Sequence, residues 1–290
     1  MTTIDLGALL VGKYRVERLI GRGGTALVFR AYDREHRRYV ALKQLRPEAA
    51  RGAEDIRTFL REGKLAQRAQ NEHVVRAYGT LWLAPNEPLL VFEYLPGNDL
   101  ARVVRQRGSL TVMEAVAYAK QACSGLAAIH AAGIIHADIK PSNLFLTSTA
   151  AGPHVKIVDF GAAHSSTHEA PKGLVGSPPF MPPEQLRNEP SLAERRDLWA
   201  LGAALFTLLA GRSPFERRYL TETWQAILSG DVPDLSALRS DVPPALSAVV
   251  QRCLAAEPSR RFASAHELSA ALTPFGCTPS RFSHWERLSA

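Results

Sequence analysis

The feature that most constrains the fold is a change of pattern at Pro96-Gly97-Asn98. Before this turn-forming tripeptide, short apolar stretches alternate with turn residues, which is typical of β-strands. After it, apolar residues recur mostly at helical spacing. A chain of 290 residues has room for one large domain or for two lobes. The sequence therefore predicts an α+β fold with a sheet-rich first lobe and a helical second lobe.

The first part of the chain has the pattern of a small sheet with one helix. Strands are predicted over residues 14–21, 27–32, 39–43, 77–83 and 89–94. The segment 54–70 has helical spacing, and its expected inward face carries Ile56, Phe59, Leu60 and Leu65. We place this N-lobe at about residues 12–95.

The second part is dominated by helix signals. Thr111 with Glu114 forms a capping box that opens a long helix, and Gly133 stands where a glycine follows a helix end. Further helices are predicted over residues 195–210, 221–229, 244–255 and 264–272, whereas residues 171–183 are too rich in proline and glycine for regular structure. We place this C-lobe at about residues 96–274 and a short tail at 275–290, all within one domain of residues 1–290.

The charge does not indicate a nucleic-acid partner. The net charge is +7, from 35 basic and 28 acidic residues. The arginines are scattered, however, and no basic run is interleaved with aromatic residues. The hydrophobic fraction of 46% supports a true core and argues against disorder.

The cysteines and the apolar runs predict a reduced protein without a membrane anchor. Cys123, Cys253 and Cys277 are far apart, and no paired Cys or His spacing indicates zinc. The N-terminus has neither a basic start nor a long apolar stretch, so no signal peptide is expected. The longest apolar run, residues 198–210, is shorter than the ~20 residues that span a bilayer. We expect a cytoplasmic location.

A glycine-rich turn in the first lobe is suited to phosphate. Gly21, Gly23 and Gly24 would let backbone amides approach phosphate oxygens. A strand pattern follows them, whereas a dinucleotide-binding fold would continue with a helix. Lys43 could reach those phosphates and Glu62 could pair with it. Alone, an ordinary hairpin turn and a surface ion pair explain these residues equally well.

Two further clusters in the second lobe carry oxygen ligands and a candidate base. Asp138, Lys140 and Asn143 lie in one short loop between apolar residues. Asp138 could orient a substrate hydroxyl, and the amide of Asn143 could bind Mg²⁺. Asp159 ends an apolar strand, where a carboxylate can meet a metal, and Gly161 follows it. An ordinary polar turn is the alternative for the first of these loops.

Two more clusters, residues 176–184 and 196–202, follow in the chain. In this order the five clusters resemble those of eukaryotic-like (Hanks-type) bacterial serine/threonine protein kinases, from about residue 14 to about residue 272. The resemblance implies a two-lobed protein-kinase fold, with a small antiparallel-sheet N-lobe bearing one main helix and a larger, mainly helical C-lobe. It also implies a non-specific serine/threonine protein kinase that takes ATP with Mg²⁺, or alternatively Mn²⁺, between the lobes.

The resemblance assigns roles residue by residue. Asp138 matches the catalytic base and Lys140 the phosphate-stabilising lysine, while Asn143 and Asp159 match the metal ligands. Lys43 matches the strand lysine that contacts phosphate, with Glu62 as its helix partner. The implied ATP-binding set is completed by Gly21, Gly23, Gly24, Val28, Ala41, Phe92, Glu93, Tyr94, Leu95, Asp99 and Phe145.

Four more positions match supporting roles in the family. Ser177 matches the hydroxyl that positions substrate between Asp138 and Lys140. Glu184 with Arg261, and Asp197 as a brace of the catalytic loop, match structural positions.

The departures from the family pattern concern regulation. Ala26 replaces the third loop glycine and Pro183 replaces an alanine, and both changes are minor. Ala137 stands where the family has an arginine that meets a phosphate on the activation loop. We therefore expect activity to depend little on activation-loop phosphorylation, although Ser165, Ser166 and Thr167 are candidate phosphosites.

Three function classes stay open from the sequence. The leading one is transfer of the γ-phosphoryl of ATP to serine or threonine hydroxyls of a protein. A catalytically silent scaffold is disfavoured because Lys43, Asp138 and Asp159 are all present. A small-molecule phosphotransferase is disfavoured by Lys140 and by the 176–184 segment. The sequence identifies neither the physiological substrate, nor the input signal, nor the oligomeric state.

Overall fold

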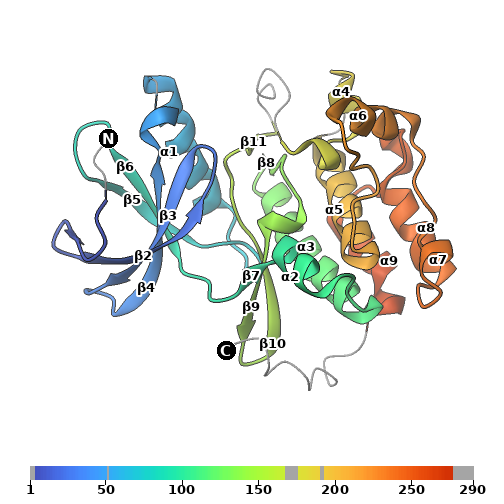
Figure 1. Cartoon of the computed structure of the whole chain (residues 1–290), viewed down its shortest axis with the longest axis horizontal. Helices are drawn as coiled ribbons and strands as arrows, with labels where there is room; N and C mark the ends of the chain where they lie inside the picture. The colour runs from blue at the N-terminus through green and yellow to red at the C-terminus, as the bar shows by residue number, and fades with distance from the viewer. Residues whose placement is uncertain (1–3, 51, 167–175, 190–192, 277–290) are drawn as a thin grey trace. The chain divides into compact units, whose positions relative to one another are not determined.

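The computed structural model describes residues 4–50, 52–166, 176–189 and 193–276. The chain divides into two compact units (Figure 1). Unit 1 comprises residues 1–70 and 75–96, and unit 2 comprises residues 71–74 and 97–290. Residues 71–74 thus belong to unit 2 although unit 1 continues after them. A single boundary in the sequence therefore does not separate the two units.

Unit 1 contains an antiparallel sheet in the order β1-β2-β3-β4-β6-β5. Its strands are β1 (Leu9–Leu10), β2 (Tyr14–Arg22), β3 (Ala26–Asp33), β4 (Arg38–Leu45), β5 (Ala77–Trp82) and β6 (Pro88–Glu93), with a 3₁₀ turn at Pro47–Ala49. All five predicted strands are confirmed. The additional strand, β1, has two residues and is too short to show a periodicity.

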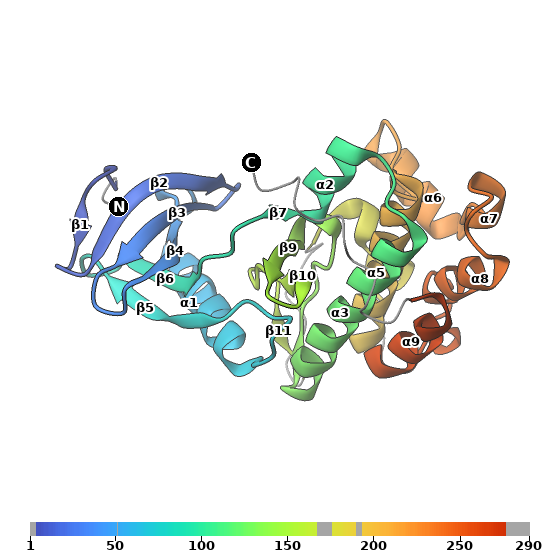
Figure 2. The ribbon, with the colours of Figure 1, turned by 90° about the horizontal axis from the view of Figure 1, so that it is seen from below.

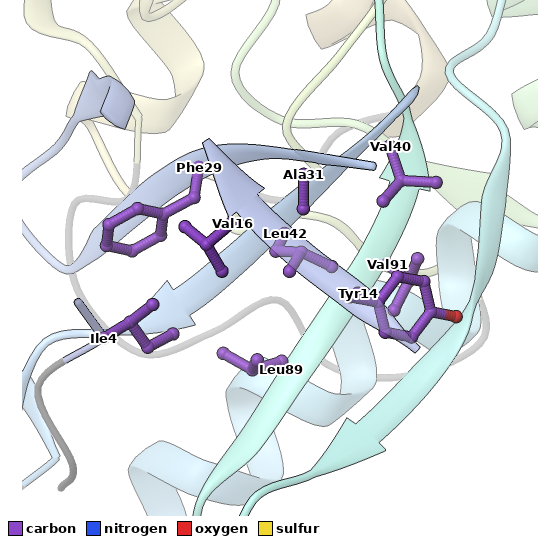
Figure 3. Close-up of a cluster of buried hydrophobic side chains, with 9 residues drawn as sticks. All are labelled: Ile4, Tyr14, Val16, Phe29, Ala31, Val40, Leu42, Leu89 and Val91. Carbon is purple, nitrogen blue, oxygen red and sulfur yellow. The ribbon is translucent and has the colours of Figure 1, made fainter. Parts of the chain in front are cut away.

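The two faces of this sheet have different roles. One face forms a core from every second residue of the central strands, including Val16, Phe29, Leu42 and Val91 (Figure 3). The helix α1 (Ala53–Arg68) confirms the helix predicted over 54–70.

Helix α1 packs on the opposite face of the sheet. A Cβ on Gly63 would lie 2.7 Å from Leu90 Cδ2, so any larger residue there would force the Leu90 side chain to shift. The strand register places Lys43 opposite both Leu90 and Val28, and Ala41 opposite Phe92. Opposed residues of paired strands share a face. Val28, Ala41, Lys43 and Phe92, four of the predicted ATP-binding residues, therefore lie on the helix side of the sheet.

Unit 2 is mainly helical, as predicted. Its helices are α2 (Leu100–Arg107), α3 (Val112–Ala131), α4 (Pro183–Leu186), α5 (Ala193–Ala210), α6 (Leu220–Ser229), α7 (Leu235–Leu238), α8 (Pro244–Cys253) and α9 (Ala265–Leu272). Short 3₁₀ turns lie at Pro141–Asn143, Pro178–Phe180, Pro258–Arg260 and Thr273–Phe275. Among the described residues, every helix is too short or too polar to cross a membrane.

The central helices follow from their local sequences. The Thr111 hydroxyl accepts from the amide of Glu114, whose carboxylate accepts from the Thr111 amide, so the predicted capping box is confirmed. The chain leaves α3 through Gly133 at φ 68°, which a side chain would disfavour. Helix α5 is apolar on all sides and buries Trp199 and Phe206, as expected for a central core helix.

Short strands in unit 2 hold the segments that carry the candidate chemistry (Figure 2). Strands β10 (Gly152–Ile157), β9 (Leu144–Thr149) and β7 (Asn98–Asp99) form one antiparallel sheet. Strands β8 (Ile134–Ile135) and β11 (His164–Ser165) form another. The loop with Asp138 joins β8 to β9, and Asp159 follows β10.

The predicted α+β fold is confirmed, with a small antiparallel sheet bearing one main helix and a mainly helical remainder. Helices α2, α4 and α7 were not predicted individually. Two of these have four residues each, which is about one turn and gives no periodicity. The irregular segment predicted at 171–183 lies partly outside the described residues, and its described end carries a 3₁₀ turn and the start of α4.

Candidate active site

Asp138 is the centre of a polar cluster in the loop between β8 and β9. Its Oδ2 accepts from Lys140 Nζ at 2.7 Å and from Asn143 Nδ2 at 3.0 Å. Lys140 Nζ also donates to Ser177 Oγ at 2.6 Å. The structure thus brings four predicted site residues together, with Lys140 bridging the carboxylate and the serine hydroxyl.

The second oxygen of the same carboxylate, Asp138 Oδ1, is buried but makes no hydrogen bond within the described residues. A buried acceptor without a partner is costly, and such atoms often mark functional sites. Gly176, at φ 117°, lies against this loop: a Cβ there would lie 2.9 Å from the Ala137 carbonyl oxygen and 3.7 Å from Asp138 Oδ1. One oxygen of Asp138 is therefore anchored by two side chains, and the other is buried without a partner among the described residues.

Asp197 holds the backbone of this loop in a strained conformation. Its two carboxylate oxygens accept from the amides of His136 (2.9 Å) and Ala137 (2.8 Å). Ala137 has φ 63°, which is uncommon for a residue other than glycine and persists where surrounding contacts enforce it. Burial raises the pKa of Asp197, but hydrogen bonds from His130 and the loop outweigh it, so the pKa is lowered and the carboxylate is ionised.

His136 connects the loop to the segment that carries Asp159. The ring is fully buried, and burial lowers its pKa, so the imidazole is neutral. Its Nε2 donates to the Val158 carbonyl at 3.3 Å, while its Nδ1 accepts from the Asp138 amide at 3.4 Å. The ring also contacts Phe160 edge-on, with centroids 5.1 Å apart. His136 is thus a positioning residue that the sequence analysis did not single out, although it begins the loop motif.

Asn143 and Asp159 both carry side-chain oxygens that could bind a metal, and both belong to unit 2. Both hydrogen bonds of the Asn143 amide use its nitrogen, so its oxygen is the atom that a cation would meet. The Val158 amide donates to the Asn143 carbonyl at 2.9 Å, which places the next residue, Asp159, beside this loop. Asp159 is exposed, at φ 65°, and accepts from the Gly161 amide. An amide oxygen and a carboxylate fit a hard cation such as Mg²⁺.

In unit 1, Lys43 and Glu62 form an ion pair across β4 and α1. Lys43 Nζ lies 2.5 Å from Glu62 Oε1, and the two side chains are 14% and 5% exposed. Partial burial makes this pair unlike a solvated surface bridge, because screening by water is reduced. The pairing expected from the resemblance is therefore present in the geometry of unit 1.

The glycine-rich turn is an exposed hairpin between β2 and β3, as the strand pattern predicted. The Gly23 amide donates to the Ala26 carbonyl at 2.8 Å. A Cβ on Gly24 would meet nothing within 4 Å, and one on Gly23 would meet only the Ala26 oxygen at 3.5 Å. Neither crowding nor a positive φ requires glycine here, and the bare backbone is open to a ligand.

The remaining predicted ATP-binding residues lie in both units. Glu93 ends β6, and its amide donates to the Arg76 carbonyl at 2.9 Å; Tyr94 and Leu95 follow it, half-buried. Phe145 lies in β9, half-buried. Asp99 also has a role that the sequence analysis missed, because its Oδ1 caps α2 by accepting from the Arg102 amide at 2.8 Å.

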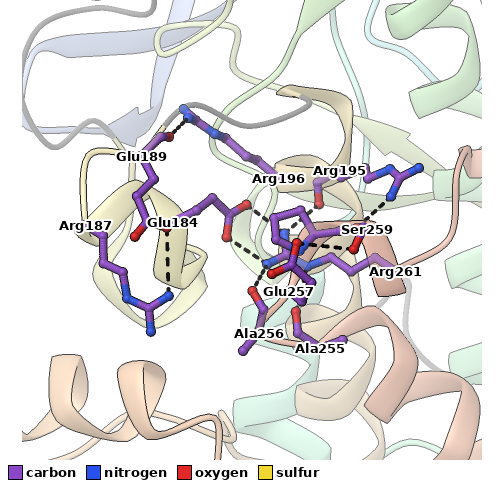
Figure 4. A network of polar contacts seen from close by, with 11 residues as sticks. Glu184, Arg187, Glu189, Arg195, Arg196, Ala255, Ala256, Glu257, Ser259 and Arg261 are labelled. Atoms are coloured by element: carbon purple, nitrogen blue, oxygen red, sulfur yellow. Dashed lines mark hydrogen bonds and ion pairs between the residues drawn. The ribbon is translucent and has the colours of Figure 1, made fainter.

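Glu184 and Arg261 form a fully buried, bidentate ion pair (Figure 4). Each terminal guanidinium nitrogen donates to one carboxylate oxygen at 2.7 Å. The other N–H groups donate to the carbonyls of Arg195, Ala255 and Ala256. All five donors of the guanidinium are thus used, and the pair links α4 to the segment that follows α8.

Comparison with known proteins identifies the family of the chain. Residues 14–272 match the protein kinase domain family. The chain is 31% identical over 270 residues to a probable serine/threonine-protein kinase of Clostridium acetobutylicum. It is 34% identical over 267 residues to the serine/threonine-protein kinase PknH of Mycobacterium tuberculosis, and 33% identical over 277 residues to pkn3 of Myxococcus xanthus.

These matches cover 91%, 90% and 92% of this chain but only 40%, 42% and 50% of the respective relatives. The chain thus spans half or less of the length of the proteins it resembles. The family model, in contrast, accounts for nearly the whole chain. The chain therefore belongs to the protein kinase domain family, among relatives of the Hanks-type serine/threonine kinases of bacteria.

Proposed function

We propose that the chain is an ATP-dependent serine/threonine protein kinase. The observation that carries this proposal is the divided carboxylate of Asp138. Oδ2 is fixed by Lys140 and Asn143, while Oδ1 is buried without a partner. A substrate hydroxyl that donates to Oδ1 would satisfy this oxygen and be oriented for attack.

Lys140 has two tasks in this proposal. Its ammonium group lies against both Asp138 and Ser177, so it holds their relative position. It also supplies a positive charge beside the transferring phosphoryl group. Ser177, whose hydroxyl accepts from Lys140 Nζ, would then help to hold the Lys140 ammonium group in position.

Each unit carries residues that we propose bind the nucleotide. A bound Mg²⁺ would neutralise phosphate charge, and Asn143 and Asp159 are the residues to hold it. Mn²⁺ prefers the same oxygen ligands and is an alternative. Lys43, oriented by Glu62, and the backbone of the 21–24 turn, apart from the Gly23 amide that already donates to the Ala26 carbonyl, would hold phosphates. Val28, Ala41, Phe92 and Phe145 would contact the adenine, with Glu93 and Leu95 offering backbone groups and Asp99 a carboxylate for the ribose.

The substrates proposed are proteins, by likeness to the relatives named as serine/threonine-protein kinases. Retention of Lys43, Asp138 and Asp159 disfavours a silent scaffold. The buried Glu184–Arg261 pair and the Lys140–Ser177 contact favour a protein substrate over a small molecule. The cytoplasmic location stays a prediction.

An assay with γ-labelled ATP and Mg²⁺ tests this function. We expect label on serine or threonine of a generic basic protein, because the candidate base and its lysine are assembled in the structure. Phosphoamino-acid analysis identifies the acceptor. Tight ATP binding without transfer would contradict the proposal in favour of a scaffold, and label found only on a small hydroxyl compound would contradict the choice of substrate.

We also propose that activation-loop phosphorylation contributes little to activity. The methyl group of Ala137 offers no charge to a phosphate. Backbone contacts hold the start of the activation loop without any phosphate. Ser165 pairs with Ile134 in the β11–β8 ladder, and the Ser166 amide donates to the Gly133 carbonyl at 2.9 Å. Thr167, the third candidate phosphosite, lies outside the described residues.

Phosphatase treatment should therefore leave turnover nearly unchanged. The comparison is between phosphatase-treated and untreated protein, with loss of phosphate confirmed by intact mass and folding by thermal melting. The matched variant is Ala137→Arg, which supplies the missing guanidinium and should make turnover sensitive to the same treatment. Loss of turnover in the treated, folded parent protein would sink the idea.

A further inference from the structure

Unit 2 contains a cluster of two imidazoles and a carboxylate away from Asp138. Glu72 and His73 lie on the segment 71–74, and His154 lies on β10. One potential ligand atom from each of the three lies within 4.8 Å of the others. The two histidines are 81 positions apart in the chain, so no short spacing in the sequence could reveal the cluster.

Backbone carbonyls orient both rings. His73 Nδ1 lies 2.9 Å from the Val155 oxygen, and His154 Nε2 lies 2.9 Å from the Glu72 carbonyl oxygen. A carbonyl only accepts, so each of these nitrogens carries the proton. The lone pairs are then on His73 Nε2 and His154 Nδ1. A ring that donates one N–H to a carbonyl and keeps the other nitrogen for a cation is the usual arrangement of a metal-binding histidine.

Two charged side chains, those of Lys156 and Glu72, lie near the His73 ring. Lys156 is directed to the backbone, because its Nζ donates to the Val74 oxygen at 3.3 Å. The exposed carboxylate of Glu72 is the one acidic ligand of the three.

We propose that Glu72, His73 and His154 bind one Zn²⁺ ion, with water as the fourth ligand. Ligand atoms of tetrahedral zinc lie about 3.4 Å apart. The three groups, at up to 4.8 Å, therefore need only a modest closure. The rings are stacked with centroids 4.5 Å apart and planes at 25°, so both side chains must also rotate out of the stack for their lone pairs to meet at one ion.

The ion would fasten the segment 71–74 to β10 within unit 2. The backbone already joins them, since the Ile157 amide donates to the His73 carbonyl at 2.8 Å and Val74 bridges Ile157. A metal would add side-chain links at the same place. Zinc is expected rather than Mg²⁺, because imidazole nitrogen suits zinc and Mg²⁺ prefers oxygen.

A second cluster serves as the control. Asp33, Glu35 and His36 in unit 1 also lie close enough for a metal. The Asp33 carboxylate, however, already accepts from two backbone amides and from the His36 ring, and Lys13 lies 3.8 Å away. We therefore expect no zinc there.

Zinc titration of the full chain, in excess Mg²⁺ to fill the oxygen-ligand site, tests the proposal. We expect one Zn²⁺ per chain and a higher unfolding temperature when it is bound. His73→Asn and His154→Gln keep an amide N–H where each ring donates but remove the second nitrogen, and Glu72→Gln removes the charge. Each should weaken Zn²⁺ binding at least about tenfold, since even loss of a supporting partner costs about 10–100-fold. The control His36→Asn should bind like the parent protein.

X-ray absorption of the zinc-loaded protein gives a second readout that does not depend on variants folding. Two imidazoles and light oxygen ligands at about 2.0–2.1 Å, without sulfur at about 2.3 Å, support the site. Absence of stoichiometric binding, zinc–sulfur ligation, or unchanged affinity in the first three variants would overturn the proposal. So would loss of binding in His36→Asn alone.

Discussion

Asp138→Asn is expected to lower the rate of phosphoryl transfer by about 10²–10⁴-fold, the usual contribution of a positioned general base. The amide cannot take a proton from a substrate hydroxyl. Its oxygen can still accept from Lys140 and Asn143, as Oδ2 of Asp138 does at 2.7 and 3.0 Å. The variant therefore removes the chemistry of Oδ1 and leaves the loop assembled. Single-turnover transfer from γ-labelled ATP measures the effect.

The control for this variant is nucleotide binding and thermal melting, both of which should match the parent protein. A melting temperature that falls together with activity would indicate loop collapse, and rescue is then sought with Asp138→Glu, which keeps a carboxylate. Parent-like turnover in a folded Asp138→Asn protein would show that another group orients the hydroxyl. That result would contradict the role of Asp138 on which the proposed function depends.

Arg261→Met is expected to destabilise the protein by about 3–5 kcal/mol, the usual cost of leaving one member of a buried ion pair alone. Glu184, only 2% exposed, would lose both charge-assisted bonds at 2.7 Å. The carbonyls of Arg195, Ala255 and Ala256 would each lose a donor as well. Denaturant unfolding followed by tryptophan fluorescence measures the change, because Trp199 is buried in unit 2.

A double variant separates the ion pair from packing. Arg261→Met with Glu184→Gln removes the stranded charge and should be more stable than Arg261→Met alone. The matched surface control is Arg57→Met, whose pairing with Glu54 joins two side chains that are 66% and 75% exposed, so its loss should leave the free energy of unfolding nearly unchanged. Equal losses of unfolding free energy in Arg57→Met and Arg261→Met would show that the buried ion pair does not stabilise the fold.

How far the sequence could predict the site depends on the distance between partners along the chain. Asp138, Lys140 and Asn143 lie within six residues, so their proximity follows from the loop itself. Lys43 and Glu62 are 19 residues apart and lie on different elements, and only the family resemblance paired them in advance. The 77-residue separation of Glu184 and Arg261 is likewise beyond any local pattern.

Other features were beyond the sequence because they depend on contacts between distant segments or on a second role. The close approach of Gly176 to the Ala137 carbonyl joins the Asp138 loop to a residue 38 positions later. Asp99 was given a ligand role, yet its carboxylate also caps a helix whose start had not been predicted. The Glu72, His73 and His154 cluster joins a loop to a distant strand. Regular elements were predicted well because periodicity is local, whereas one-turn helices and two-residue strands carry none.

The segment 71–74 has a consequence for how the chain can be divided. It leaves unit 1, contributes to unit 2, and returns to unit 1 at Val75. Within this segment, the His73 carbonyl oxygen accepts a hydrogen bond from the Ile157 amide. Gly125 packs against the same oxygen, because a Cβ on Gly125 would lie only 2.6 Å from it. A cut between Pro96 and Gly97 would therefore not yield two self-sufficient halves. The second fragment would lack residues 71–74, which belong to unit 2. Reassembly of unit 2 from the two fragments would require the first fragment to supply this segment.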